Sequence, residues 1–418
     1  MASEWKTIRA ADFIEFNPRL SIKKGAMATK VAMDKLQPFT KKIPATEQAE
    51  FAGGSKFCNG DTIMARITPC LENGKTAYVD ILADGEVAFG STEFIVMRAR
   101  AGISDPQFVY YLATSPAFRN VAIKSMVGSS GRQRVQQGVL DELELIVPPL
   151  EEQQKIGAML AMLDQKIALN NKINDNLLQQ AQSVFTDWFV RFTPFASDEL
   201  VASPIEMEIP KSLSMIQIGD VPHILETGRR PKGGAADSGI PSVGAENVKQ
   251  LGMFDFSSKK FIPEDFAAKQ KTGRIKGYEL LLYKDGGKPG TFIPHFSMFG
   301  EGFPYTDFFI NEHVFKLDFF DRGKNIFAYF YMQTDYATSW LANNGGKAAI
   351  PGINQQDVRA IWIYDMDHPQ VQQFCRWVEP LFKTIFCNCY ENMRLADLRD
   401  TLLPKLISGK IDVSSVKL

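Results

Sequence analysis

The sequence has few residues of the kinds that bind metals or form disulfides. Its 418 residues include five cysteines and four histidines. The cysteines, at positions 58, 70, 375, 387 and 389, are odd in number and lack the paired spacing of zinc ligands. We therefore expect reduced thiols with a structural role, and neither a disulfide framework nor a structural metal.

Long hydrophobic runs and an excess of charge are also missing. No stretch of 18 apolar residues occurs, and the start, "MASEWKTIRAADF", has no basic segment followed by an apolar one. We therefore expect neither a membrane span nor a signal peptide. Lys and Arg total 47 against 48 Asp and Glu, which argues against a protein coated in nucleic acid. With 45% apolar residues, the chain is expected to be a cytoplasmic protein of two or three folded domains.

Familiar catalytic signatures are absent from the sequence. It contains no Gly-rich dinucleotide fingerprint, no phosphate-binding loop ending in Gly-Lys-Ser/Thr, no His-Glu-x-x-His and no Gly-x-Ser-x-Gly elbow. "FNPRL" superficially resembles the Asn-Pro-Pro-aromatic motif of amino-methyltransferases, but Arg19 and Leu20 replace its last two residues. The sequence therefore favours binding over catalysis, with no cofactor held by this chain.

Positive charge gathers in two segments, one in each half of the chain. Residues 19–42 carry seven basic residues and one acid, and residues 229–276 carry ten basic residues and five acids. Two such segments are expected of a protein with two basic surface patches that each contact a phosphate backbone. Each segment alone is also compatible with a solvated, lysine-rich face.

The two halves share an order of motifs, which indicates an internal duplication. In the first half "GDTIMARITPCLENGK" is followed by "STEFIVMRA", "FVYYLATSPAFR" and "GSSGRQRVQQGVLDELELIVPP". In the second half "GYELLLYKDGGKPG" is followed by "INEHVFKLDF", "IFAYFYMQTDYATSW" and "NNGGKAAIPGINQQDVRAIWIY". Equivalent residues are separated by nearly constant distances along the chain. Gly60 and Gly277 are 217 positions apart, Glu93 and Glu312 are 219 apart, and Asp141 and Asp357 are 216 apart.

Each copy reads as β-rich with inserted helices. "EFIVMRA" and "HVFKL" have the composition of strands, and "PQFVYYLATSPAFRNVA", residues 106–122, reads as one helix. Glycine-rich turns separate these elements. The pattern predicts two similar α+β domains.

A long helix is predicted after each copy. The first begins just past "PPLEEQQ" and runs to about Phe189, and the second runs from about Pro369 to Leu403. Their heptads place paired asparagines in the apolar stripe, where an asparagine fixes register and orientation; alternatively, these residues lie just off the seam and touch water. The predicted core positions are Leu160, Leu163, Ile167, Asn170, Asn174 and Leu177 in the first helix, and Leu381, Ile385, Asn388, Asn392 and Leu395 in the second.

The predicted architecture alternates domains and helices: a β-rich domain over residues 1–148, a helix over 149–190, a linker and second domain over 191–367, and a helix with a tail over 368–418. If the helices form an antiparallel coiled coil, they bring Asn170 and Asn174 level with Asn388 and Asn392, and the domains are related by a pseudo-twofold axis. The paired helices would then set the distance between the domains.

These motifs resemble the specificity subunit of type I restriction-modification systems. The resemblance spans nearly the whole chain and rests on "GDTIMARITPCLENGK", "FGSTEFIVMRA", "PPLEEQQKI" and the terminal "LRDTLLPKLISGKI". It implies a non-catalytic subunit whose two target-recognition domains each read one half of a bipartite site in double-stranded DNA. It also implies partners: two modification subunits that bind S-adenosylmethionine, and restriction (translocase) subunits that use ATP and Mg²⁺. Since the second copy lacks "TPCLENGK" and "GSTEF", the two half-sites are expected to differ.

Within this interpretation, DNA contacts are expected from donors on loops and strand ends. The candidates in the first copy are Lys24, Lys30, Arg66, Thr68, Ser130, Arg132, Gln133 and Arg134. Those in the second copy are Thr227, Arg229, Arg230, Lys232, Lys284, Lys288 and Lys347. Two other functions are weighed against this one: a self-contained DNA methyltransferase or nuclease, and a coiled-coil scaffold that does not bind DNA.

Overall fold

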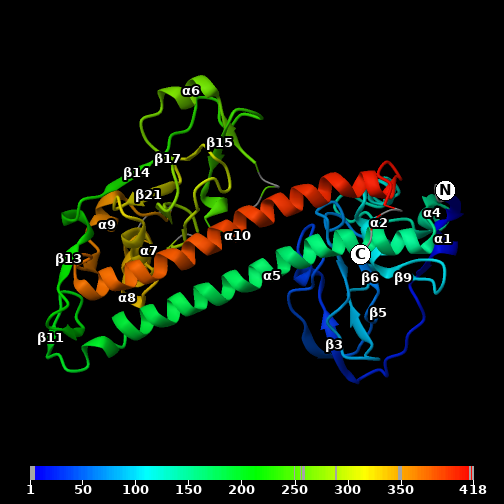
Figure 1. Ribbon diagram of the computed structural model, residues 1–418, viewed down its shortest axis with the longest axis horizontal. Helices are drawn as coiled ribbons and strands as arrows, with labels where there is room; N and C mark the ends of the chain where they lie inside the picture. Colours follow the sequence, from blue (N-terminus) through cyan, green and yellow to red (C-terminus); the bar gives the residue numbers. More distant parts are fainter. Residues whose placement is uncertain are drawn as a thin grey trace. The chain divides into compact units, whose positions relative to one another are not determined.

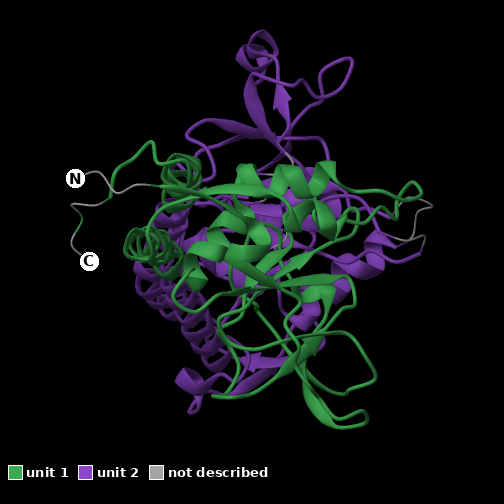
Figure 2. Cartoon of the chain, turned by 90° about the vertical axis from the view of Figure 1, so that its right-hand side faces the viewer, with its two compact units in different colours: residues 1–167, 394–418 green, residues 168–393 purple. Residues whose placement is uncertain are grey.

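The chain divides into two compact units in a computed structural model, which describes residues 5–248, 250–254, 256, 259–287, 290–346, 351–413 and 416. Unit 1 comprises Met1–Ile167 and Arg394–Leu418, and unit 2 comprises Ala168–Met393 (Figure 2). Each unit therefore contains one copy of the repeated sequence and a part of both long helices.

Unit 1 is built on two four-stranded sheets and a two-stranded pair. The strands of the first sheet lie in the order β2 (Ile14–Phe16), β9 (Phe94–Ala99), β6 (Thr62–Ala65), β7 (Thr76–Tyr78). Those of the second lie in the order β4 (Glu47–Glu50), β3 (Met27–Val31), β8 (Ala88–Gly90), β5 (Ser55–Phe57), in which β3 and β8 are parallel. The pair consists of β1 (Lys6–Arg9) and β10 (Glu144–Val147).

Unit 2 repeats this topology strand for strand. Its sheets have the orders β14 (Ile224–Thr227), β21 (Val314–Asp318), β18 (Leu280–Tyr283), β19 (Phe296–Ser297), and β16 (Phe261–Ile262), β15 (Ile240–Val243), β20 (Phe308–Ile310), β17 (Arg274–Ile275). The parallel pair recurs as β15 and β20, and the two-stranded pair as β13 (Met215–Gln217) and β22 (Trp362–Tyr364). A hairpin of β11 (Leu200–Ala202) and β12 (Glu208–Pro210) is added. The recurrence of one uncommon parallel pair within the same strand order establishes the duplication.

The short helices also recur. Unit 1 has α1 (Ala10–Phe13), α2 (Pro106–Thr114), α3 (Pro116–Lys124), α4 (Gln137–Asp141) and the 3₁₀ turn η1 (Met33–Lys35). Unit 2 has α6 (Glu264–Lys269), α7 (Arg322–Tyr331), α8 (Asp335–Gly345), α9 (Gln355–Arg359) and the turns η2 (Thr193–Phe195), η3 (Ile218–Asp220) and η4 (Ala245–Asn247). An aspartate caps both α2 and α7, since Asp105 accepts a hydrogen bond from the Phe108 N–H and Asp321 accepts one from Lys324.

The prediction of one helix over residues 106–122 is wrong. The chain leaves the helical conformation at Ser115, whose φ and ψ are −68° and 150°. The following residue is Pro116, and the ring of a proline disfavours the helical conformation of the residue before it. The segment therefore forms two helices, α2 and α3.

The two long helices are α5 (Leu150–Phe189) and α10 (Pro369–Ile407). Helix α5 begins directly after Pro149, earlier than predicted, and α10 continues through Pro404 instead of ending at Leu403. Within each unit the two helices run side by side in opposite directions (Figure 1).

Polar side chains connect the helices where asparagines occupy the stripe. In unit 2 the Asn170 Nδ2 donates to Asn392 Oδ1 at 2.9 Å, and the Asn388 Nδ2 donates to Asn174 Oδ1 at 2.8 Å. The two residues of each pair lie opposite each other on the two helices, as an antiparallel arrangement requires. Asn170 is fully buried (0% exposed), so the alternative in which it touches water is wrong. A buried amide that finds a polar partner in one alignment only fixes that alignment.

The predicted stripe describes only part of the helix packing. Leu160, Asn170 and Ile385 are buried, whereas the other predicted core positions are half-buried: Leu163, Ile167, Asn174, Leu177, Leu381, Asn388, Asn392 and Leu395. Large buried side chains lie outside the predicted heptads, namely Phe185, Phe189, Phe382 and Phe386. They pack against the β-rich part of unit 2; for example, the Phe185 ring stacks on Phe330 of α7 with centroids 5.6 Å apart.

A buried network ties both helices to the domain of unit 1. The Lys41 Nζ lies 4.7 Å from the centre of the Tyr111 ring and within 5.3 Å of two further tyrosine rings, and it donates to the Tyr111 hydroxyl at 3.1 Å. That hydroxyl donates to Asp164 Oδ2 of α5 at 2.5 Å, and Arg399 of α10 donates to Asp164 Oδ1 at 2.6 Å. Burial lowers the pKa of Lys41 to about 8.

We expect this lysine to make stability depend on pH. Because its folded pKa lies below the unfolded value near 10.5, the unfolded chain binds more protons between these values, so stability rises with pH in that window. Lys41→Met should remove a penalty on the order of 3 kcal/mol at pH 7 and a smaller one at pH 9.5. Urea unfolding followed by circular dichroism at both pH values measures the difference. Exposed Lys42→Met is the matched control, and equal effects of the two substitutions at both pH values would contradict the prediction.

Candidate nucleic-acid interface

A glycine-rich loop meets the end of the same strand in both units. In unit 1, after β6, the Thr68 N–H donates to Gln133 O at 3.0 Å and the Val135 N–H donates to Arg66 O at 2.9 Å. In unit 2, after β18, Gly286 donates to Pro351 O at 2.9 Å and Ile353 donates to Lys284 O at 2.8 Å. The segments 133–135 and 351–353 therefore occupy equivalent places, and Arg66 corresponds to Lys284.

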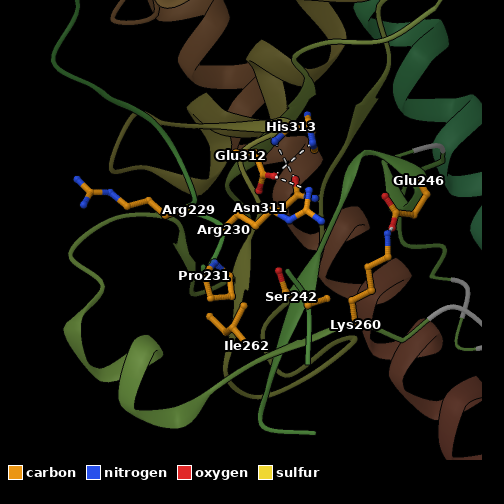
Figure 3. A pocket seen from close by; sticks show the side chains of 11 residues that line it. Arg229, Arg230, Pro231, Ser242, Glu246, Lys260, Ile262, Asn311, Glu312 and His313 are labelled. Atoms are coloured by element: carbon orange, nitrogen blue, oxygen red, sulfur yellow. Dashed lines mark hydrogen bonds and ion pairs between the residues drawn. The ribbon is translucent and has the colours of Figure 1, made fainter. Parts of the chain in front are cut away.

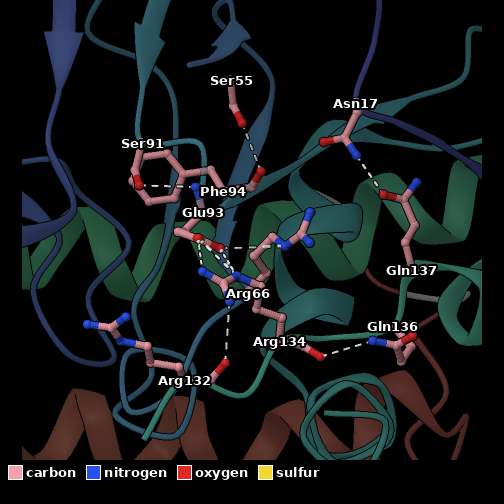
Figure 4. Close-up of polar contacts among 10 residues, drawn as sticks. All are labelled: Asn17, Ser55, Arg66, Ser91, Glu93, Phe94, Arg132, Arg134, Gln136 and Gln137. Carbon is pink, nitrogen blue, oxygen red and sulfur yellow. Dashed lines mark hydrogen bonds and ion pairs between the residues drawn. The ribbon is translucent and has the colours of Figure 1, made fainter. Parts of the chain in front are cut away.

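In unit 1 two arginines converge on one carboxylate (Figure 4). The Arg134 Nε donates to both oxygens of Glu93 at 3.0 Å, and its Nη2 donates to Oε1 at 2.7 Å. Arg66 forms an ion pair with the same group, its Nε 3.7 Å from Oε2. The hydrogen bonds from Arg134 hold the pKa of Glu93 below its usual range, so Glu93 is ionised at neutral pH and the arginines are held in place.

The loop around these residues exposes further donors. Ser130 and Arg132 are exposed, and Figure 4 shows the Arg132 side chain pointing away from Glu93. Gly128 has a φ of 136°, and a Cβ at this position would lie 2.9 Å from the Arg132 carbonyl oxygen. Only glycine fits this turn without strain, and the turn places Arg132 at the surface.

The remaining candidates of unit 1 differ in their availability. Lys24 is exposed. Lys30 is engaged in an ion pair with Glu47 at 2.7 Å, and the Thr68 hydroxyl donates to Glu72 at 2.9 Å. The Gln133 carbonyl belongs to the loop pairing described above. Lys24 and the loop around Arg132 thus offer the freest donors of this unit.

In unit 2 a cavity of about 150 Å³ lies at the corresponding place (Figure 3). In the figure Arg230 and His313 converge on Glu312: Arg230 Nη1 is 3.8 Å and His313 Nε2 is 3.4 Å from Glu312 Oε1. On another wall Lys260 forms an ion pair with Glu246. The cavity is lined by Arg229, Arg230, Pro231, Ala235, Ser242, Glu246, Lys260, Ile262, Asn311, Glu312 and His313.

The predicted donors of unit 2 fall into three groups. Arg229, Arg230 and Lys232 are exposed, and Thr227 is half-buried at the end of β14. The Lys284 ammonium is engaged internally, because it donates to the Glu312 carbonyl at 3.1 Å. Lys288 and Lys347 lie outside the described residues.

The acidic partners in both units were missed in the sequence. Candidates were chosen as hydrogen-bond donors to bases and phosphates, and this criterion omits carboxylates such as Glu93 and Asp285. The alignment of Glu93 with Glu312 was also shifted by one residue: Arg66 N–H donates to Glu93 O, whereas Lys284 N–H donates to His313 O. His313 therefore occupies the place of Glu93, and its Nδ1 lies 2.5 Å from Asp285 Oδ1.

The described residues contain neither a cluster of metal ligands nor a membrane-spanning helix. None of their His, Cys, Asp and Glu side chains gather in threes as metal ligands would. Within the same residues, no helix has the combined length and apolar character needed to span a membrane.

The duplicated fold, with arginine or lysine side chains near the end of the same strand in each copy, defines a class of protein: a two-domain nucleic-acid reader whose units are linked by paired helices. Residues 2–179 match the family model described as type I restriction modification DNA specificity domain. Two curated relatives carry the corresponding name. The MjaIX specificity subunit of Methanocaldococcus jannaschii is 26% identical over 74% of this chain and 70% of its own length. The HindI specificity subunit of Haemophilus influenzae is 24% identical over 84% and 86%.

A solved structure supports the fold. The S subunit of a type I restriction-modification system from M. genitalium has a TM-score of 0.53 at 16% identity and covers 97% of this chain and 96% of its own. Residues 2–179 thus match a DNA specificity domain of type I restriction-modification systems, and most of the chain is similar to specificity subunits of these systems. The resemblance read from the sequence and the predicted fold class are thus confirmed.

Proposed function

We propose that this chain is the non-catalytic subunit that gives a type I restriction-modification enzyme its DNA specificity. Each unit reads one half of a bipartite target in double-stranded DNA. The observation that carries the proposal is the pair of equivalent loop sites with different residues: Arg66, Glu93 and Arg134 in unit 1 correspond to Lys284, His313 and Gly352 in unit 2. Because different side chains occupy the same place, the two half-sites differ in sequence.

The helices have two roles in this proposal. The chain passes between the units only along α5 and α10, so these helices set the spacing between the half-sites. They also dock two modification subunits, which bring S-adenosylmethionine, and restriction subunits that use ATP and Mg²⁺ join the complex. Apolar side chains exposed on α5, such as Leu169 (53%) and Ile173 (38%), supply a surface for docking. The complex acts in the cytoplasm, where the DNA is.

The two other functions explain fewer observations. A coiled-coil scaffold accounts for the helices but leaves the equivalent arginine- and lysine-bearing sites of the two units without a role. A self-contained methyltransferase or nuclease needs a cofactor loop or a catalytic constellation, and neither motif occurs in the sequence.

The dependence of DNA binding on salt tests the proposal. Binding of the protein, assembled with its modification subunits, to random-sequence duplex should weaken steeply with salt, because each neutralised phosphate adds about −0.9 to the slope of log K against log salt. With several phosphates contacted we expect a slope of about −4 or steeper. The modification subunits alone are the control. A slope equal to that of the control would show that this chain contributes no phosphate contacts and would contradict the proposal.

A further inference from the structure

We infer that Arg134 reads a guanine in the half-site of unit 1 and that Glu93 is its positioning residue. This inference rests on the proposed function and assigns a base to one of its two sites. It starts from the arrangement in which Glu93 holds one edge of the Arg134 guanidinium group.

The hydrogen-bond count shows which donors of Arg134 remain for a ligand. A guanidinium group has five N–H donors in a rigid plane. Glu93 takes the Nε donor and one Nη2 donor. Apart from a long contact of Nη1 with the Arg132 carbonyl at 3.4 Å, the far end, with Nη1 and the second Nη2 hydrogen, has no partner among the described residues. Two parallel donors at this end match the O6 and N7 acceptors of guanine in the major groove.

The carboxylate argues for base reading over phosphate binding. A residue that only attracts phosphate gains nothing from a neighbouring negative charge, which weakens the attraction. A residue that reads a base gains from being held in one orientation before DNA arrives, since less rotamer freedom is lost on binding. Glu93 is itself fixed: its N–H donates to Ser91 Oγ at 3.1 Å and its carbonyl accepts from the Arg66 N–H at 2.9 Å.

Two neighbouring groups are less suited to reading a base. Both oxygens of Glu93 already accept hydrogen bonds from Arg134, and Oε2 also pairs with Arg66, so the charge of Glu93 is largely neutralised and it is a weaker acceptor for the amino group of a cytosine. Arg132 is exposed and points away from Glu93, so no carboxylate of this cluster orients it. Arg132 is therefore suited to a phosphate contact, and Arg134 to a base contact.

The described residues of unit 2 do not form this arrangement. The bridge between Ile67 and Arg134 corresponds to the bridge between Asp285 and Gly352, so a glycine stands where unit 1 has its reading arginine. The inference therefore concerns one half-site only, and it identifies a residue-level cause of the difference between the two.

The test maps methylated sites in the DNA of a host that carries the complete system with Arg134→Gln. The wild-type half-site read by unit 1 should contain a fixed guanine. In the variant we expect the preference for guanine at that position to fall on the order of 10- to 100-fold. Adenine should now be accepted there, because glutamine reads adenine, and the preferences at every other position should not change. Glu93→Gln should relax the same position to a smaller extent and increase affinity for random duplex, because a negative charge is removed. Glu93→Asp, which retains the charge, should recover part of the discrimination.

Arg132→Gln is the matched control, and it should weaken binding to all sequences alike and reduce the salt slope by about 1. If Arg134→Gln instead behaves like this control and keeps every base preference, Arg134 contacts phosphate and the inference is wrong while the proposed function stands. The inference would also be wrong if the half-site read by unit 1 contained no guanine whose recognition changes when Arg134 is replaced. If Arg134→Gln does not assemble with the modification subunits, Arg134→Lys keeps the charge and should relax the same position. Absence of sequence-specific methylation by the wild-type complex would refute the proposed function itself.

Discussion

Lengthening both long helices by four residues is expected to lengthen the spacer between the two half-sites by one or two base pairs. The insertions are placed between Ile167 and Ala168 in α5 and between Met393 and Arg394 in α10, where the chain passes from one unit to the other. Four residues add about 6 Å to a helix, which corresponds to about two base pairs at 3.4 Å each. The bases recognised in each half should not change, because both reading sites are untouched.

The helix seam should tolerate this change. Four residues nearly complete a helical turn, so the apolar stripe continues through a local stutter. The pair of Asn170 with Asn392 and that of Asn174 with Asn388 both lie within unit 2 and keep their alignment. Since two extra base pairs also turn the duplex by about 70°, given 10–10.5 base pairs per turn, we expect methylation of the lengthened target to be less efficient than that of the wild-type target.

Methylation mapping in a host that carries the variant complex measures the spacer, and circular dichroism establishes that the helices are intact. The matched control inserts the same four residues into α5 alone. That change shifts the two helices out of register and should abolish methylation. An unchanged spacer in the folded double-insertion variant would show that the helices do not set the distance.

The duplication and the asparagine pairs could be predicted because their signals are local or periodic. The order of motifs repeats along the chain, and heptad spacing alone brings Asn170 level with Asn392 once the helices are taken as antiparallel. The pairing of β3 with β8, by contrast, has no signal in either strand, because a parallel pair depends on the crossover between them.

The aromatic side chains of the long helices show why the helix packing was only partly predicted. A heptad pattern finds residues that face a partner helix. Phe185 and Phe189 instead face α7 and the β-rich part of unit 2, and Phe189 lies 5.1 Å from Phe327 between ring centroids. Their positions depend on contacts with residues more than 130 positions away, which no local pattern encodes.

The candidate site was incomplete for a related reason. Arg134 was recognisable as a donor in a glycine-rich loop, but its partner Glu93 is 41 residues away in sequence and precedes a strand in a motif that appeared structural. Arginine and lysine can be listed from chemistry alone, whereas the carboxylate that orients one of them emerges only when β9 and the loop meet. The same holds for Asp285 and His313 in unit 2.

Removing three cations from unit 2 should impair one half-site and spare the other. The variant combines Arg229→Ala, Arg230→Ala and Lys232→Ala. All three side chains are exposed, and the ion pair of Arg230 with Glu312, at 3.8 Å and with Arg230 64% exposed, contributes little to folding. We expect the salt slope of DNA binding to become shallower by about 1 to 2, because each of the three cations that contacts a phosphate contributes about 0.9. Discrimination among bases should fall in the half-site of unit 2 alone, because Arg229 and Arg230 line the cavity together with His313, which occupies the place of Glu93, and a base contact from this cavity would be lost with them.

The reciprocal variant supplies the control, since it removes the same charge from unit 1 through Lys24→Ala, Lys30→Ala and Arg134→Ala. Binding is measured on duplexes in which one half-site or the other is scrambled. The unit 2 variant should lose its preference for an intact unit 2 half-site and retain its preference for an intact unit 1 half-site, and the unit 1 variant should show the opposite pattern. Because the two units are separate compact bodies with their own cores, a loss in one should not be transmitted to the other. Equal loss at both half-sites in either variant would mean that the units do not read DNA independently.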